Sequence, residues 1–302
     1  MRTPPGWETH DHHYAGYEVA HYESGMAIDS DAEAWWLNLD YRGLMASFFD
    51  KVDTRRVRAL VCGRADDPEG DYAILAANAH RLPELRALFL GAAGPEQYEI
   101  TWITQCDLNP LLAAFPRLER LEIRYGSEEL ALGPLRHEAL KMLRIESGCM
   151  PGELVRSIGA SDLPALEHLE LWLGIREYGG DHTAEDLEPL LTGERLPSLR
   201  HLGLQNSERQ DEIAAQVSTA PIVARLESLA LSIGELTDVG AEALLGGQPL
   251  THLRALDLHH NFLSRAMIDR LEKALPGVDL DLERAGDWSD GVEVTPYVAV
   301  AE

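Results

Sequence analysis

The chain of 302 residues contains little of several features that mark common classes of protein. Its three cysteines, Cys62, Cys106 and Cys149, lie far apart, so neither a disulfide framework nor a thiolate metal site is indicated. Basic residues are scarce, because 26 Lys and Arg stand against 51 Asp and Glu. A net charge of −25 repels phosphate groups, so we expect neither a nucleic-acid partner nor a membrane partner.

Long apolar runs are also missing from the sequence. No stretch of 18 apolar residues occurs, and the residues after Met1 lack the apolar core of a secretory leader. We therefore expect a soluble, cytoplasmic protein. Its acidic balance fits two interpretations: a surface that keeps the protein in solution, or a surface that attracts a basic partner.

One pattern is abundant: an apolar residue, two others, an apolar residue, one other and an apolar residue. It recurs about every 28 residues, with weaker copies that begin at Ala34, Val57 and Leu275. Counting the weaker copies, about ten rows span residues 34–282. The seven clear copies are Leu85-Leu88-Leu90, Leu118-Leu121-Ile123, Leu140-Leu143-Ile145, Leu166-Leu169-Leu171, Leu199-Leu202-Leu204, Leu226-Leu229-Leu231 and Leu253-Leu256-Leu258.

Segments with helical spacing separate these copies, which predicts alternating strands and helices. We expect helices at 43–52, 71–81, 153–160, 184–192, 212–220, 239–245 and 264–275. The predicted fold is an α/β leucine-rich-repeat solenoid, a horseshoe with a parallel sheet on its concave face and helices on its convex face. We expect residues 1–33 to form an N-terminal cap, 34–282 the solenoid, and 283–302 a linker and a strand that covers the last coil.

Two rows are longer than the average and place extended loops at residues 91–105 and 174–183. Insertions in a solenoid lie on one edge and often carry binding, although variable surface loops are as common. The first loop contains Trp102, and the second contains Tyr178 and Asp181.

The strand residues between the ladder leucines face away from the core and line the concave face. In the middle rows these residues are large and polar, and we expect Trp172 to stand exposed among them, with Tyr125 nearby. Two interpretations remain open, cross-strand ion pairs on a solvated sheet or a docking surface for a peptide or protein. The candidate partner-binding residues are Arg120, Glu122, Arg124, Tyr125, Arg144, Glu146, His168, Glu170, Trp172, His201, Gln205, Tyr178 and Asp181.

Evidence for catalysis or metal binding is weak by comparison. The run His10-Asp11-His12-His13 and the pair His259-His260 beside Asp257 contain ligand-type side chains without a metal-site spacing. No phosphate loop, nucleophile elbow or zinc signature is present in the sequence. We therefore predict no catalytic residue, no metal and no cofactor.

Several stretches resemble a known family. They are 57–61, 99–103, 168–174, 178–181, 257–261 and 297–300. The chain is similar to bacterial cytoplasmic proteins with leucine-rich-repeat, ribonuclease-inhibitor-like domains. This resemblance implies a repeat fold, interaction with proteins and no catalytic residues. Because some similar proteins are encoded near peptide-modifying enzymes, it also implies an alternative, an accessory subunit or a metal-dependent component of a biosynthetic gene cluster.

Overall fold

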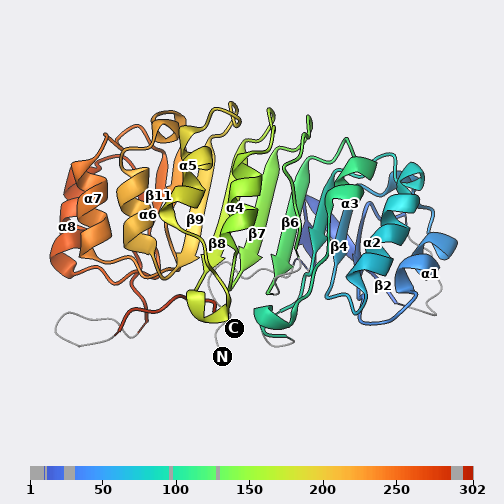
Figure 1. Cartoon of the computed structure of the whole chain (residues 1–302). Coiled ribbons are helices and arrows are strands. Elements are labelled where there is room, and N and C mark those ends of the chain that lie inside the picture. The colour runs from blue at the N-terminus through green and yellow to red at the C-terminus, as the bar shows by residue number, and fades with distance from the viewer. Residues whose placement is uncertain are drawn as a thin grey trace.

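The computed structural model describes residues 10, 12–23, 31–94, 98–126, 130–286 and 295–301. Within them, one sheet of twelve strands runs along the molecule, and each strand pairs with its neighbours in sequence (Figure 1). The first pair is antiparallel and every later pair is parallel. The strands are β1 (His13–Tyr14), β2 (Tyr17–Tyr22), β3 (Ala34–Leu37), β4 (Ala59–Cys62), β5 (Ala87–Leu90), β6 (Arg120–Tyr125), β7 (Met142–Ser147), β8 (His168–Gly174), β9 (His201–Ser207), β10 (Ser228–Ala230), β11 (Ala255–Asp257) and β12 (Asp279–Asp281).

Helices fill most connections and cover one side of the sheet (Figure 1). The α-helices are α1 (Leu44–Lys51), α2 (Pro68–Ala77), α3 (Asn109–Ala114), α4 (Gly152–Gly159), α5 (Ala184–Thr192), α6 (Gln210–Val217), α7 (Asp238–Gly246) and α8 (Arg265–Ala274). Short 3₁₀ turns are η1 (Thr54–Arg56), η2 (Ala79–Arg81), η3 (Ile100–Trp102), η4 (Arg176–Tyr178) and η5 (Pro221–Arg225).

The aliphatic ladder confirms the predicted repeat. Leu121, Leu143 and Leu169 pair in register across β6, β7 and β8, and the ladder continues through Leu202 and Leu229. All of them are buried in one continuous core between the sheet and the helices. The fold is therefore a leucine-rich-repeat solenoid, and its ten parallel strands β3–β12 match the ten rows counted in the sequence.

Local capping explains where the helices begin. The side chains of Thr237 and Ser264 accept hydrogen bonds from the first turns of α7 and α8, and Thr183 forms a capping box at α5. Helix α2 begins three residues earlier than predicted, because Asp67 caps it. Helix α3 was not predicted, since six residues are too few to show a helical period.

The hairpin of β1 and β2 lies against the concave wall of the first rows. Tyr14 packs on Phe89 with ring centroids 6.3 Å apart, and both belong to a second apolar cluster with Val19 and Val61. Strand β2 also pairs with β3, which extends the parallel sheet by one row. The first rows are thus covered by the chain's own N-terminal segment.

Residues 295–301, called the C-terminal segment below, cross the ends of strands in the middle of the array (Figure 1). The backbone of Val300 hydrogen-bonds to Asn206 at the end of β9, and Ala299 N–H donates to the carbonyl of Ile233 after β10. The expectation that this segment covers the last coil was therefore wrong. It runs back over earlier coils, because their strand ends supply the backbone partners.

Among the described residues, no helix combines the length and the apolar character that a membrane span requires.

Candidate functional site

The first residues of the middle strands form a row across the concave face, called the entry row below. Arg120, Met142, His168, His201 and Ser228 pair in register from β6 to β10, and each is half-buried. The rings of His168 and His201 lie 5.6 Å apart, and His201 Nδ1 lies 2.7 Å from Ser228 Oγ. Burial and the neighbouring His168 lower the pKa of His201, which favours the neutral imidazole. The entry row is therefore partly exposed to solvent.

Deeper on the same face lies an ion-pair cluster that Arg144 holds together. Its guanidinium contacts three carboxylates, with Nη2 2.8 Å from Glu146 Oε1, Nε 3.2 Å from Glu170 Oε1 and Nη1 3.8 Å from Glu122 Oε2. These contacts join β6, β7 and β8. We use the name ion-pair cluster for Arg120, Glu122, Arg124, Arg144, Glu146 and Glu170.

Burial and neighbouring charges shift the pKa values within the ion-pair cluster. Arg124 has no exposed surface, and its Nε donates to Glu146 Oε2 at 2.5 Å. Burial lowers the pKa of Arg124, and Glu146 opposes that effect. Burial acts against the ionised form of Glu122, yet His10, Arg120 and Arg144 outweigh it and lower its pKa to about 2. The charged side chains of the cluster are therefore compensated mostly by one another and only to a small extent by solvent.

Trp172 was expected to be exposed, and this expectation was wrong. The indole is fully buried in a small cluster with Ile100, Ile233 and Val300. Its Nε1–H donates to Glu170 Oε1 at 3.4 Å, and the Arg144 guanidinium lies 5.6 Å from its ring. Strand alternation does place the side chain on the concave face, but segments from distant parts of the chain cover it there.

Two further candidates are also buried. Tyr125 lies in the main core instead of beside Trp172, because it continues the inward-facing series of Leu121 and Ile123. Gln205 is 6% exposed and donates to Ser232 Oγ at 2.7 Å. Of the concave-face candidates, the structure leaves Arg120, His168, Glu170 and His201 half-buried.

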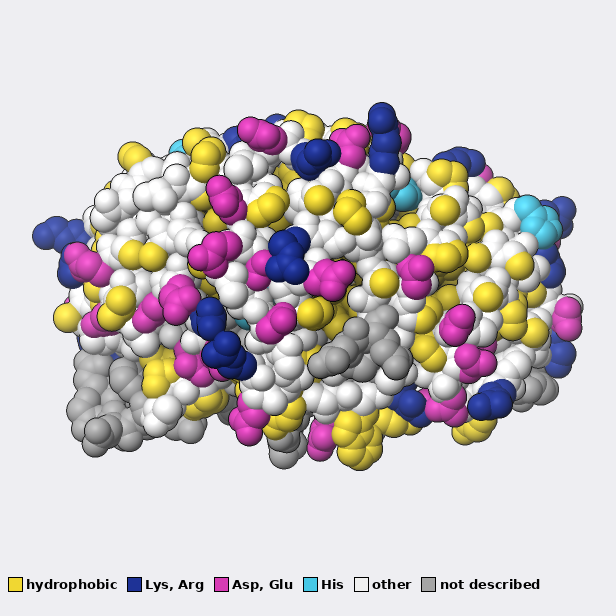
Figure 2. Space-filling view, viewed as in Figure 1, with side chains coloured by type: hydrophobic (Ala, Val, Ile, Leu, Met, Phe, Trp, Pro, Cys, Tyr) yellow, Lys and Arg dark blue, Asp and Glu magenta, His cyan; other side chains and the backbone are white. Residues whose placement is uncertain are grey.

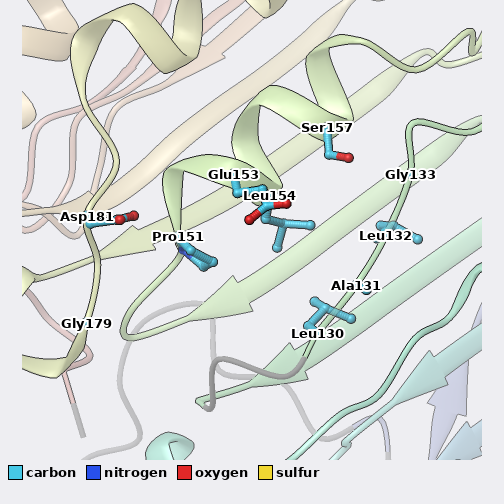
Figure 3. Close-up of a pocket in the computed structure, with 10 residues that line it drawn as sticks. All are labelled: Leu130, Ala131, Leu132, Gly133, Pro151, Glu153, Leu154, Ser157, Gly179 and Asp181. Atoms are coloured by element: carbon cyan, nitrogen blue, oxygen red, sulfur yellow. The ribbon is translucent and has the colours of Figure 1, made fainter.

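The candidates in the second long loop have different environments. Tyr178 ends η4 and is half-buried. Asp181 is exposed and accepts a hydrogen bond from the Gly152 N–H at 2.7 Å, at the start of α4. Figure 3 shows Asp181 beside a cleft of about 420 Å³ between α4, the strand-like segment 130–133 and this loop. Asp181 thus accepts a hydrogen bond from a backbone N–H at the start of α4, a role that sequence spacing did not reveal.

An exposed indole is present, but in the first long loop. Trp102 in η3 is 62% exposed, one of three large exposed hydrophobic residues among those described. A side chain at Gly126 would meet the Thr101 backbone, so this glycine keeps the loop against the sheet. In Figure 1 the turns η3 and η4 flank the end of the C-terminal segment.

Sequence reasoning missed the residues that hold the C-terminal segment. Asn206, Ile233 and His260 end three successive coils with positive φ angles of 56°, 56° and 51°. Asparagine adopts this left-handed conformation more readily than most residues, so Asn206 carried a usable signal. Ile233 carried none, because a β-branched residue is among the least suited to that conformation.

The ligand-type clusters show internal pairing. Asp257, His259 and Asp281 each place one ligand atom within 4.8 Å of the others, but His259 Nδ1 lies 2.7 Å from Asp257 Oδ1. The carboxylate raises the pKa of His259 against the effect of burial, which indicates an ion pair. His10 faces Glu122 at 3.6 Å, whereas His12 and His13 are exposed and Asp11 lies outside the described residues.

The helix-covered face differs from this concave wall. Figure 2 shows that acidic, basic and hydrophobic side chains are interspersed there. Such mixing does not single out a docking surface on the face shown, so the concave side and its two flanking loops remain the candidate site.

Comparison with known proteins gives likenesses of different strength. No family model and no curated protein matches the chain. A leucine-rich repeat domain of APL1B (14% identity, 82% of this chain, 64% of that chain) and an internalin from Listeria monocytogenes (14%, 86% and 72%) give TM-scores of 0.33 and 0.36. These scores are too low to transfer any property to this chain.

A protein from Bacteroides fragilis, solved as a structural genomics target, is much more similar. It is 30% identical over 86% of this chain and 76% of its own, with a TM-score of 0.77. The two proteins are thus similar in both sequence and fold over most of each chain. The chain therefore belongs to the same family as this Bacteroides fragilis protein.

Proposed function

We propose that this protein is a non-enzymatic scaffold that binds a protein or peptide on its concave face, between the two long loops. The observation that carries this proposal is the entry row, a continuous half-exposed line of side chains across five parallel strands. Repeat solenoids present such curved surfaces to partners. The resemblance to bacterial leucine-rich-repeat proteins supports the same function.

The types of side chain support a polar interface with a few large anchors. His168, His201 and Met142 supply the area of the entry row, and the exposed Trp102 lies on a flanking loop. Trp is enriched among interface residues whose truncation costs the most binding energy. The net charge of −25 favours a basic partner, because it accelerates the encounter with positive charge.

The proposal also includes a bacterial origin and a cytoplasmic location for the protein. The bacterial relative supports a bacterial origin. Cys62 and Cys149 are buried thiols, and neither forms a disulfide with another described cysteine, which is typical of a reducing compartment such as the cytoplasm.

Site-specific photo-crosslinking tests the surface. A photoreactive amino acid replaces Met142 in the entry row or, as a matched control, the exposed Val239 on α7. We expect a discrete crosslinked partner from position 142 and none from position 239. The double change His168→Ala and His201→Ala should reduce that crosslink at least tenfold, since truncated anchors cost about 2 kcal/mol.

The opposite distribution would reject the proposed surface. Crosslinks from position 239 alone would place any partner on the convex face. An equal yield with and without the two histidines, in protein with unchanged melting, would remove the entry row from the interface.

A further inference from the structure

The C-terminal segment contacts a line of residues that has the features of a peptide-binding site. The line consists of Trp172, Asn206, Ile233 and His260, and we call it the tail groove. Three of these residues end successive coils, so their backbone and side chains face one line across the array. The bound segment is Tyr297-Val298-Ala299-Val300-Ala301.

The contacts of the tail groove are made mostly to main-chain atoms. Asn206 Nδ2 donates to the Val300 carbonyl at 2.6 Å, and the Val300 N–H donates to Asn206 Oδ1 at 3.0 Å. One coil further, the Ala299 N–H donates to the Ile233 carbonyl at 2.8 Å. One coil beyond that, His260 Nε2 lies 3.2 Å from the Tyr297 carbonyl. A site that satisfies backbone groups in this way holds an extended chain of almost any sequence.

Side-chain contacts add selectivity at two positions of the segment. Val300 packs into the buried cluster with Trp172, Ile100 and Ile233. The Tyr297 ring meets the rings of His260 and Phe262 with centroids 5.2 and 5.3 Å apart. The groove therefore selects an aromatic residue followed three positions later by a branched aliphatic residue.

The coils adopt an unfavourable conformation to make these contacts. A positive φ is strained for Ile233, and strained backbone is retained where the surroundings require it, often at binding sites. Gly148 provides room at the far end, because a Cβ there would lie 2.4 Å from the Ala301 carbonyl oxygen. The strained residue Ile233 and the open position at Gly148 both lie along the path of the C-terminal segment.

We propose that the tail groove is a binding site for a segment of another protein, an extended neutral peptide with the chemistry of Tyr-Val-Ala-Val. The chain's own C-terminal segment occupies this site and competes with the external peptide. The inference rests on the proposed scaffold function and specifies a ligand class. It uses residues distinct from the entry row, so each can fail alone.

Binding of a labelled peptide to full-length protein tests this inference. The probe is fluorescein-labelled Thr-Pro-Tyr-Val-Ala-Val-Ala, the sequence of residues 295–301, measured by anisotropy. Val300→Asp places a charge in the buried cluster and should release the tethered competitor. We expect this variant to bind the probe at least tenfold more tightly than the wild type. Thr295→Asp, which adds the same charge at an exposed position, should bind as weakly as the wild type.

Two changes in the groove check that the probe occupies it. In the Val300→Asp background, Asn206→Ala should lower probe affinity at least tenfold, because it removes both bonds to the peptide backbone. Gly148→Val should also lower it, by filling the space at the peptide end. If Val300→Asp fails to fold, the half-buried Tyr297→Ser provides the same comparison with a smaller loss of packing.

Two results would overturn the inference. If the released variants melt within a few degrees of the wild type and bind no probe, the C-terminal segment is only a structural cover. If light scattering shows a wild-type dimer that Val300→Asp converts to a monomer, the occupant is a second copy of this chain. Crosslinking from Met142 would be unaffected in the first case, which separates this failure from failure of the scaffold function.

Discussion

Two adjacent stretches of the concave wall are both mostly buried, but their chemistry is opposite. Along one register row, Val61 and Phe89 on β4 and β5 are followed by Glu122, Arg144 and Glu170 on β6 to β8. The apolar part is covered by the β1–β2 hairpin. The charged part pairs its side chains with one another. The leucine repeat is the same in both stretches, so it determines only the side of the sheet that faces the helices.

Because of this difference, we expect substitutions in the two stretches to change stability in different ways. Apolar side chains gain stability from burial alone, and similar shapes can replace them. A buried ion pair contributes little net stability, but removal of one partner leaves a charge without compensation. We therefore expect the ion-pair cluster to be the more fragile of the two stretches.

The largest expected effect comes from Glu146→Ala. It removes the partner of the fully buried Arg124 and one of the three carboxylates around Arg144. We expect the free energy of unfolding to fall by about 3–5 kcal/mol. Urea denaturation measures this change as a lower transition midpoint.

A double replacement serves as the control for this effect. Arg124→Met with Glu146→Leu removes both charges and fills the space, and it should recover most of the loss. A cost below about 1 kcal/mol for Glu146→Ala would mean that water already reaches this part of the wall.

The second effect is loss of stability in acid. The pKa of Glu122 is about 2 in the folded protein, below its ordinary value of 4.5. Its contribution is therefore complete above pH 4.5 and is lost as the pH falls through 2. That contribution is about 3 kcal/mol. Unfolding followed from pH 6 to pH 2 should show the decline, and Glu122→Gln should flatten it. A slope identical in the two proteins would contradict the assignment.

Sequence reasoning predicted the ladder, the rows and most helices, because each depends on local periodicity. It also placed Arg144 and Glu170 on one face, since strand alternation is a local rule. It did not predict that Val300 would cover Trp172, because that contact joins segments far apart in the chain. The left-handed Ile233 was equally unpredictable, since tertiary contacts outweigh its intrinsic preference. The strand residues were thus assigned to the correct side of the sheet, whereas the expected exposure of Trp172 was wrong.

The third effect concerns the apolar stretch. Phe89→Leu keeps an apolar but smaller side chain against Tyr14 and Val61, and it removes the ring contacts with the Arg124 guanidinium at 5.3 Å and with His10 at 5.6 Å. We expect a loss of about 1 kcal/mol. The loss should be the same at pH 7 and pH 3, in contrast to the contribution of Glu122, which declines over that range. A loss that depends on pH would show that the two stretches are energetically coupled.

The smallest effect concerns a half-buried carboxyl group outside the ion-pair cluster. Burial raises the pKa of Glu235 to about 7, and the negative charges of Glu208 and Asp211 add to the rise. Because the folded pKa is raised, the charged form destabilises the protein increasingly as the pH rises from 4.5 through 7. Glu235→Gln should therefore stabilise the protein at pH 8, and by only about 0.5–1 kcal/mol because solvent screens this half-buried group.

Thermal melts of Glu235→Gln at pH 4 and pH 8 would complete the comparison. Glu122 and Glu235 both lose solvent on folding, but only Glu122 faces arginines. A stabilising change at pH 8 that disappears at pH 4 would confirm that the charged form of Glu235 costs stability, in contrast to Glu122, whose charge the arginines stabilise. If Glu235→Gln and the wild type instead melt at the same temperature at both pH values, solvent reaches Glu235 freely. Burial would then not explain the difference between the pKa values of the two carboxyl groups.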